Sequence, residues 1–158
     1  MDYFEKFLNK ALRFLSFRPR SEKEIRDNLH KKKTPLEIIE RIVKSLKDNK
    51  FLNDEEFAKW FIDQRLRFRP KSLRIIKLEL KSKGIGKETI EQTFDNLQLT
   101  FDSLDLDSAK KLVERKIDKY KGMPKQIVYQ KLGAFLARRG FDWETIKKSI
   151  DDALSNKV

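Results

Sequence analysis

Apolar residues recur at helical spacing along most of the chain. In the N-terminal stretch they occupy positions i, i+3, i+4, i+7, i+8 and i+11, which form one stripe of a helix: Phe4, Phe7, Leu8, Ala11, Leu12 and Leu15. Similar stripes lie within residues 38–46 and 57–62. The alternating pattern of half-buried β-strands is weak everywhere, so the sequence predicts an all-α protein.

Helix-start signals divide this pattern into short segments. Ser21 is followed three residues later by Glu24, which is a capping box and predicts a helix to about Lys32. Pro35 suits the first turn of the next helix, and the stretch "NDEE" at 53–56 predicts another start. These signals indicate several short helices joined by tight turns.

The chain repeats itself at intervals of slightly more than fifty residues. A shift of 51 aligns "FRPRSEKEIRDNL" (17–29) with "FRPKSLRIIKLEL" (68–80), and a shift of 56 aligns "LKSKGIGKETI" (80–90) with "LARRGFDWETI" (136–146). The front of the last repeat fits a shift of 54, which predicts a two-residue insertion in its middle helix. We therefore expect three tandem three-helix repeats forming an elongated, curved array, at residues 1–50, 51–100 and 101–158.

The repeated pentapeptide, "FRPRS" and then "FRPKS", predicts an elbow between the first and second helices of a repeat. Pro19 and Pro70 disfavour helix in the residue before them, and Ser21 and Ser72 are suited to cap the helix that follows. A repeated phosphate-binding motif and coincidence are the alternatives. The elbow explains the proline and the serine, but it does not explain the basic residues on both sides of each proline.

Charge adds a functional hypothesis to this architecture. The chain carries 37 Lys and Arg against 25 Asp and Glu, a net charge of +12, which favours a polyanionic partner. Residues 65–83 contain eight basic side chains and one acidic one, Glu79. We expect this strip to contact nucleic-acid phosphates or an acidic protein surface. The candidate DNA- or filament-binding residues are Arg18, Arg20, Arg65, Arg67, Arg69, Lys71, Arg74, Lys77, Lys81, Lys83, Arg138 and Arg139.

Several kinds of site have little support in the sequence. There is no cysteine and one histidine, His30, which excludes Cys-based zinc sites, thiol nucleophiles and His-dependent triads. "GIGK" at 84–87 lacks the spacing of a phosphate-binding loop, and Gly84 and Gly140 suit left-handed helix ends instead. "DSLDLD" at 102–107 lacks the glycine and final glutamate of a calcium-binding loop and fits a capped helix start.

These patterns predict a protein that is not an enzyme and has no metal or cofactor. Aromatic residues such as Trp60, Phe61 and Phe68 could stack on bases, but most aromatic residues fall on helical core positions. No apolar run approaches the roughly 20 residues of a membrane span, and the N-terminus lacks a signal-peptide pattern. We expect a monomer in the cytoplasm that does not bind a membrane.

The sequence resembles the RecX family, bacterial regulators of the RecA recombinase. The similar segments cover nearly the whole chain: "ALRFLSFRPRSEKEIRDNL" (11–29), "FLNDEEFAKWFIDQR" (51–65), "RPKSLRIIKLELKSKGI" (69–85) and "FLARRGF" (135–141). The departures are at turns. Lys32-Lys33-Thr34, Asn49-Lys50 and Ser72 stand where the family often has glycine, so they bear on local turn geometry.

The resemblance implies a regulator that binds the RecA–single-stranded DNA filament along its groove and inhibits its ATPase and strand exchange. It places the protein in DNA repair, recombination and the SOS response. Single-stranded DNA is the expected nucleic acid, with double-stranded DNA as a second candidate. Two alternatives remain: a basic helical-repeat protein that binds nucleic acid without a recombinase partner, and a scaffold whose basic face docks on an acidic protein.

Overall fold

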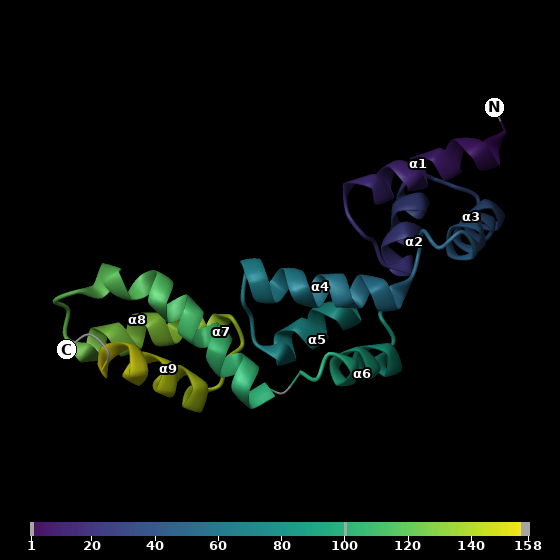
Figure 1. Cartoon of the computed structure of the whole chain (residues 1–158). Coiled ribbons are helices and arrows are strands. Elements are labelled where there is room, and N and C mark those ends of the chain that lie inside the picture. The colour runs from purple at the N-terminus through teal and green to yellow at the C-terminus, as the bar shows by residue number, and fades with distance from the viewer. Residues whose placement is uncertain (1, 100, 156–158) are drawn as a thin grey trace. The chain divides into compact units, whose positions relative to one another are not determined.

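The structure, a computed structural model, describes residues 2–99 and 101–155, and these residues are helical apart from short connections (Figure 1). The all-α prediction is confirmed. The helices follow one another in three groups of three, and a short 3-10 helix, η1 (Ile117–Tyr120), precedes the last middle helix. Their bounds are α1 (Tyr3–Phe17), α2 (Glu22–Lys31), α3 (Leu36–Asp48), α4 (Asp54–Phe68), α5 (Leu73–Ser82), α6 (Lys87–Asn96), α7 (Phe101–Lys116), α8 (Lys125–Arg138) and α9 (Trp143–Ser155).

The first three helices pack around one apolar core. Helices α1, α2 and α3 contact one another (Figure 1), and the apolar stripes predicted within α1 and α3 pack into the core of this bundle. Ser21 accepts from the Glu24 N–H at 3.1 Å while the Glu24 carboxylate accepts from the Ser21 N–H at 3.1 Å, so the predicted capping box is confirmed. The core of this bundle consists of Phe7, Ala11, Ile25, Leu29, Ile39, Ile42, Val43, Leu46 and Leu52.

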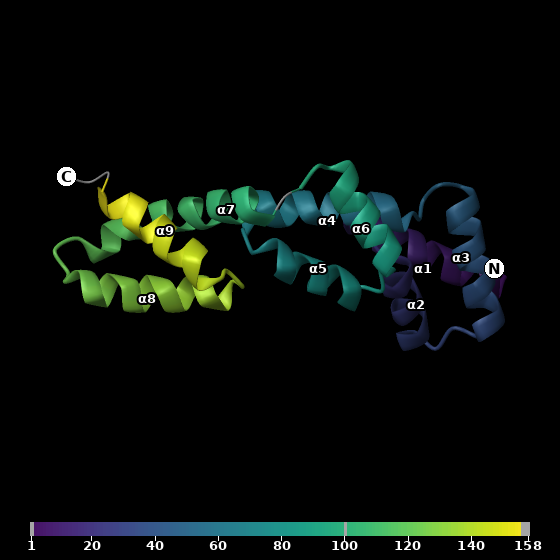
Figure 2. The same ribbon diagram turned by 90° about the horizontal axis from the view of Figure 1, so that it is seen from below.

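The last three helices form a second bundle, in which α9 packs against both α7 and α8 (Figure 2). Its middle helix, α8, has 14 residues, whereas α2 and α5 have 10 each. The middle helix of the last repeat is thus four residues longer, two more than the insertion predicted from the shifted alignment. The core consists of Ala109, Leu112, Val113, Ile117, Val128, Leu132, Leu136, Phe141, Ile146 and Ile150.

The compact units of the chain do not coincide with the three repeats. Unit one contains residues up to Phe61 together with Glu79–Asp95, and unit two contains Ile62–Leu78 together with the residues from Asn96 onward. The division passes through α4 and α5 of the middle repeat. The repeat boundaries near residues 50 and 100 stay a prediction from the sequence.

Four helices end in the same way, with one residue in the left-handed region. The φ angles are +61° at Lys33, +62° at Lys50, +81° at Gly84 and +93° at Gly140. In each case the next residue donates its N–H to the carbonyl five residues back, which is the Schellman arrangement. The predicted helix ends at Gly84 and Gly140 are confirmed. The two lysines occupy turns in which glycine would adopt the same conformation without strain.

Replacing Lys33 or Lys50 by glycine is expected to stabilise the protein by about 0.5–1 kcal/mol each. A side chain at such an angle costs roughly 1–2 kcal/mol, and the greater unfolded-state entropy of glycine cancels part of that gain. Denaturant midpoints would measure the change. Lys32→Gly is the control, because Lys32 has φ −87° and should only lose stability. Equal destabilisation by Lys32→Gly and Lys33→Gly would contradict the assignment.

Candidate nucleic-acid interface

The first elbow docks on the end of the next middle helix, within unit one. The Ser21 hydroxyl donates to the Lys83 carbonyl at 2.7 Å, and the Glu22 N–H donates to Asp54 Oδ1 at 2.9 Å. Gly84 lies so close that a Cβ placed on it would be 2.5 Å from the Lys23 Cβ. We call this contact joint one.

The second elbow makes an equivalent contact, within unit two. The Ser72 N–H donates to the Arg139 carbonyl at 3.0 Å, and the Leu73 N–H donates to Asp105 Oδ1 at 2.8 Å. A Cβ on Gly140 would lie 2.1 Å from Ile75 Cγ1. We call this contact joint two.

The two joints use positions that the repeat alignment pairs with each other. Ser21 and Ser72 are both buried at a joint, and the hydroxyl of each caps the helix that follows it. Asp54 corresponds to Asp105, and the Lys83–Gly84 pair corresponds to Arg139–Gly140. The elbow predicted between two helices of one repeat is therefore also the contact to the next repeat.

In joint one, the basic residues of the pentapeptide are neutralised by neighbours. The Arg18 guanidinium pairs with the Glu24 carboxylate and lies 5.6 Å from the centre of the Trp60 ring. Arg20 lies 3.7 Å from the centre of the Phe14 ring, donates to the Phe14 carbonyl at 3.1 Å, and exposes 13% of its side chain. Both arginines thus stabilise the fold of unit one.

Glu24 supplies the carboxylate that pairs with the basic residues of joint one. Its side chain is 14% exposed. Burial raises the pKa of Glu24, but hydrogen bonds from the Arg18 guanidinium and the Ser21 N–H, with the charges of Arg18 and Lys83, hold it below its usual value. A carboxylate with a lowered pKa stabilises the folded state while it is ionised. This contribution is fully present above the unfolded-state pKa and is lost as the pH falls through the folded-state pKa.

Replacing Glu24 by glutamine should therefore destabilise the protein in a pH-dependent way. At pH 7 we expect a loss of about 1–3 kcal/mol, the usual value of hydrogen bonds to a charged group. The difference should begin to shrink below about pH 4.3, the ordinary pKa of glutamate, and should be lost as the pH falls through the lower pKa of Glu24 in the folded state. Asp54, whose pKa is raised by burial, is present in both proteins, so its titration cancels in the difference between their stabilities. Denaturation at pH 7 and pH 3 measures this, and an unchanged difference would contradict it.

In joint two the same basic positions have different neighbours. Arg69 and Lys71 correspond to Arg18 and Arg20, but the position of Glu24 is taken by Ile75. The positions of Trp60 and Phe14 are taken by Lys111 and Arg65. The carboxylate and both aromatic rings of joint one are thus replaced by one apolar residue and two further cations. These aligned positions of the second elbow therefore carry one negative charge fewer and two positive charges more than those of the first.

Helices α4, α5 and α8 bring further cations to joint two. Arg74 is exposed, and its guanidinium donates to the Gly140 carbonyl at 3.3 Å. Arg67 pairs with Asp63 at 2.9 Å, and the Arg139 guanidinium lies 4.9 Å from the Phe135 ring centre. Backbone and side-chain contacts thus place Arg138 and Arg139 beside the second elbow. We define the unit-two basic surface as Arg65, Arg67, Arg69, Lys71, Arg74, Lys77, Arg138 and Arg139.

The remaining predicted residues belong to unit one. Lys81 is exposed on α5, and Lys83 is half-buried with its ammonium 3.8 Å from Glu24. Together with Arg18 and Arg20 they surround joint one. The twelve predicted binding residues therefore form two groups. Four lie at joint one, which contains Glu24, and eight lie at joint two, where Ile75 occupies the position of Glu24.

Two apolar residues of unit two are exposed. The alignment of the two elbows pairs Leu78 with Asp27, and Leu78 is 53% exposed on α5, the helix that carries Arg74 and Lys77. Phe68, which was named among the aromatic residues that could stack on bases, is exposed as well. The pairing of Glu24 with Arg18 was missed by sequence reasoning, although the loss of that glutamate between the two aligned elbows is visible in the sequence.

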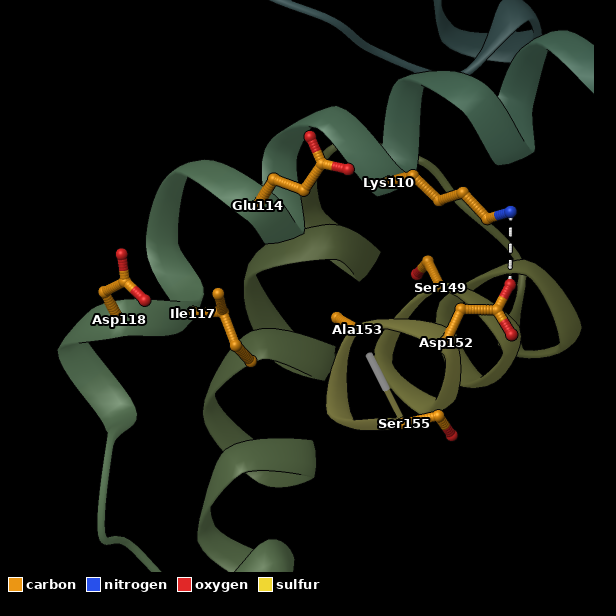
Figure 3. Close-up of a pocket in the computed structure, with 8 residues that line it drawn as sticks. All are labelled: Lys110, Glu114, Ile117, Asp118, Ser149, Asp152, Ala153 and Ser155. Carbon is orange, nitrogen blue, oxygen red and sulfur yellow. Dashed lines mark ion pairs between the residues drawn. The ribbon is translucent and has the colours of Figure 1, made fainter. Parts of the chain in front are cut away.

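A pocket of about 560 Å³ lies between α7 and α9, and its chemistry disfavours a phosphate ligand (Figure 3). Glu114, Asp118 and Asp152 line it, and the Lys110 ammonium, 3.1 Å from Asp152, is already paired. Within residues 2–99 and 101–155, no cluster of His, Cys, Asp and Glu has the grouping needed to hold a metal ion. Among these same residues, every helix is too short or too polar to cross a membrane.

Comparison with known proteins agrees with this architecture. Family models for the first, second and third three-helix domains of RecX match residues 8–46, 53–93 and 103–150. Proteins named Regulatory protein RecX from Bacillus velezensis and Listeria monocytogenes are 35% and 34% identical over 95% and 98% of this chain. The chain spans about half the length of these relatives, 56% in both cases.

Two solved structures have the same fold. A crystal structure of a regulatory protein RecX aligns with a TM-score of 0.76 at 27% identity, covering 95% of this chain and 74% of that one. A crystal structure of RecX from Lactobacillus salivarius aligns with a TM-score of 0.74 at 26% identity, covering 96% of both chains. Since models of all three of its domains match in order, and the joints between repeats recur as the alignment requires, the chain belongs to the RecX family.

Proposed function

We propose that this protein is a regulator that binds the RecA filament on single-stranded DNA and lowers its ATPase and recombination activity. It does so by binding, without catalysing a reaction. Its relatives are named regulatory proteins, which supports a regulatory role. RecA is proposed as the partner because the sequence resembles the RecX family. The binding surface is proposed because of the charged residues of unit two.

The observation that carries the proposal is the difference between the two joints. At joint one the basic residues are paired with Glu24 and covered by aromatic rings. At joint two Ile75 replaces that glutamate, and basic residues replace the rings. At these aligned positions the exchange removes one negative charge and adds two positive charges, so the second elbow is the more cationic of the two. Such a surface is well suited to phosphate groups, because counterion release makes their neutralisation favourable.

The decisive experiment measures ATP hydrolysis by RecA on single-stranded DNA with and without this protein. We expect the rate to fall as the protein saturates the filament. Filament affinity should also fall as salt rises, because single-strand contacts contribute a slope of about −0.7 per phosphate neutralised and duplex contacts about −0.9. An unchanged ATPase rate at saturation would overturn the regulatory part. An affinity independent of salt would overturn the electrostatic part.

The alternatives give different binding patterns in the same assay. A nucleic-acid-binding protein without a recombinase partner would bind naked single-stranded DNA as tightly as the filament. A scaffold for an acidic protein surface would bind RecA in the absence of DNA. The proposed function requires tighter binding to the assembled filament than to either component alone.

A further inference from the structure

An exposed phenylalanine stands at the same position in both pentapeptides. Phe17 is the last residue of α1 and is 73% exposed, and Phe68 is the last residue of α4 and is 66% exposed. An exposed phenylalanine forgoes the stabilisation that burial of its ring would give the fold. Neither elbow requires it, because the joints are made by the proline, the serine and the residues after them.

The charge around the two rings differs. Arg18, next to Phe17, is paired with Glu24 and lies over Trp60. Phe68 lies between Arg67 and Arg69, and Arg69 has lost the counterpart of Glu24. Phe68 is thus flanked along the chain by two arginines of the unit-two basic surface, of which Arg67 is paired with Asp63. Arginine next to an exposed aromatic ring is the combination that binds a phosphate and stacks on the adjoining base.

We propose that Phe68 stacks on an unpaired nucleobase while Arg69 and its basic neighbours bind the adjoining phosphates. The ligand is single-stranded nucleic acid, because the bases of a duplex already stack on one another. The occupant is chosen by charge complementarity: an apolar protein segment would not need the surrounding cations. The inference rests on the nucleic-acid part of the proposed function and adds a means of telling single strands from duplex.

The experiment compares two oligonucleotides with equal numbers of phosphates, one of thymidines and one of abasic sites. The wild-type protein should bind the thymidine strand about tenfold more tightly, because stacking of one base on an aromatic side chain is worth about 1–3 kcal/mol. Phe68→Ala should lose this preference and keep its affinity for the abasic strand. Phe68→Trp should retain the preference, and Phe68→Leu should lose it, which separates stacking from a simple apolar contact.

Phe17→Ala is the matched control, because it removes an equally exposed ring from the same motif where the arginines are neutralised. It should leave the preference unchanged. Equal affinity of the wild type for both strands, with the usual salt dependence, would overturn the stacking inference and leave the proposed function intact. Failure to bind either strand at low salt would overturn the nucleic-acid part of the proposed function. Weaker binding of Phe68→Ala to RecA without DNA would assign the ring to a protein partner.

Discussion

Gly140→Ala is expected to destabilise unit two by roughly 2–5 kcal/mol. The left-handed conformation alone costs an alanine about 1–2 kcal/mol, and overpacking typically adds about 1–3 kcal/mol. The new Cβ would lie 2.1 Å from Ile75 Cγ1 and 2.5 Å from the Ser72 hydroxyl. Joint two would have to open to admit it, and the contact of Ser72 with Arg139 would be lost. Denaturant unfolding followed by circular dichroism measures the change.

The other glycines form a graded set of controls. Gly122→Ala has the positive φ of +78° but open space around it, so it should cost only about 1–2 kcal/mol. Gly84→Ala combines φ +81° with a contact of 2.5 Å to the Lys23 Cβ, so its cost should be between those of Gly122 and Gly140. Gly86→Ala has neither restriction and should be close to neutral. A Gly140 variant no more damaged than the Gly122 variant would show that joint two is not tightly packed.

Periodicity and capping predicted the helices because both depend on neighbouring residues. The stripe from Phe4 to Leu15 and the capping box of Ser21 and Glu24 are local patterns, and both are present in the structure. The left-handed turns at Lys33 and Lys50 were harder to see, because lysine carries no signal for positive φ. There, the hydrogen bonds of the helix end hold the conformation that glycine would adopt freely.

The joints between repeats could not be predicted from the sequence alone. Ser21 and Lys83 are 62 residues apart, and no local pattern links them. The repeat alignment does pair the residues of the two joints, since Ser21, Asp54 and Gly84 all have counterparts at the aligned positions. Those paired positions are identifiable as contacts only once one joint is known. The structure also shows that the serine of each elbow is buried because it contacts the next repeat.

The candidate site was predicted as a list of basic residues, which treats all cations alike. Burial and pairing separate them. Arg18 and Arg20 contact Glu24, Trp60 and Phe14, and these contacts stabilise unit one. Composition gives the total charge, but the placement of a compensating carboxylate depends on the three-dimensional fold. For this reason the second elbow is the stronger candidate for a nucleic-acid-binding surface.

Reversing charge on the unit-two basic surface should weaken binding to single-stranded DNA about a hundredfold or more. The variant is Arg69→Glu/Arg74→Glu/Lys77→Glu. Each phosphate contact releases about 0.7 of a counterion, which at 0.1 M salt is worth about fivefold in affinity, and three contacts multiply to about a hundredfold. The salt slope should fall by about 2. Because Arg74 also donates to the Gly140 carbonyl, the double variant Arg69→Glu/Lys77→Glu tests the surface without touching that contact.

A control variant reverses three positive charges elsewhere in unit two. It distinguishes binding at the unit-two basic surface from a general effect of net charge. Lys119, Lys121 and Lys125 are exposed near the start of α8, whose 14 residues place Arg138 roughly 20 Å away along the helix. That distance is about twice the Debye length at 0.1 M salt, so these lysines should act weakly on a ligand bound at joint two. We expect the triple variant with glutamate at these positions to lose less than about fivefold, one phosphate contact's worth. Comparable losses in both triple variants would mean that the net charge of +12, and no particular surface, attracts the nucleic acid.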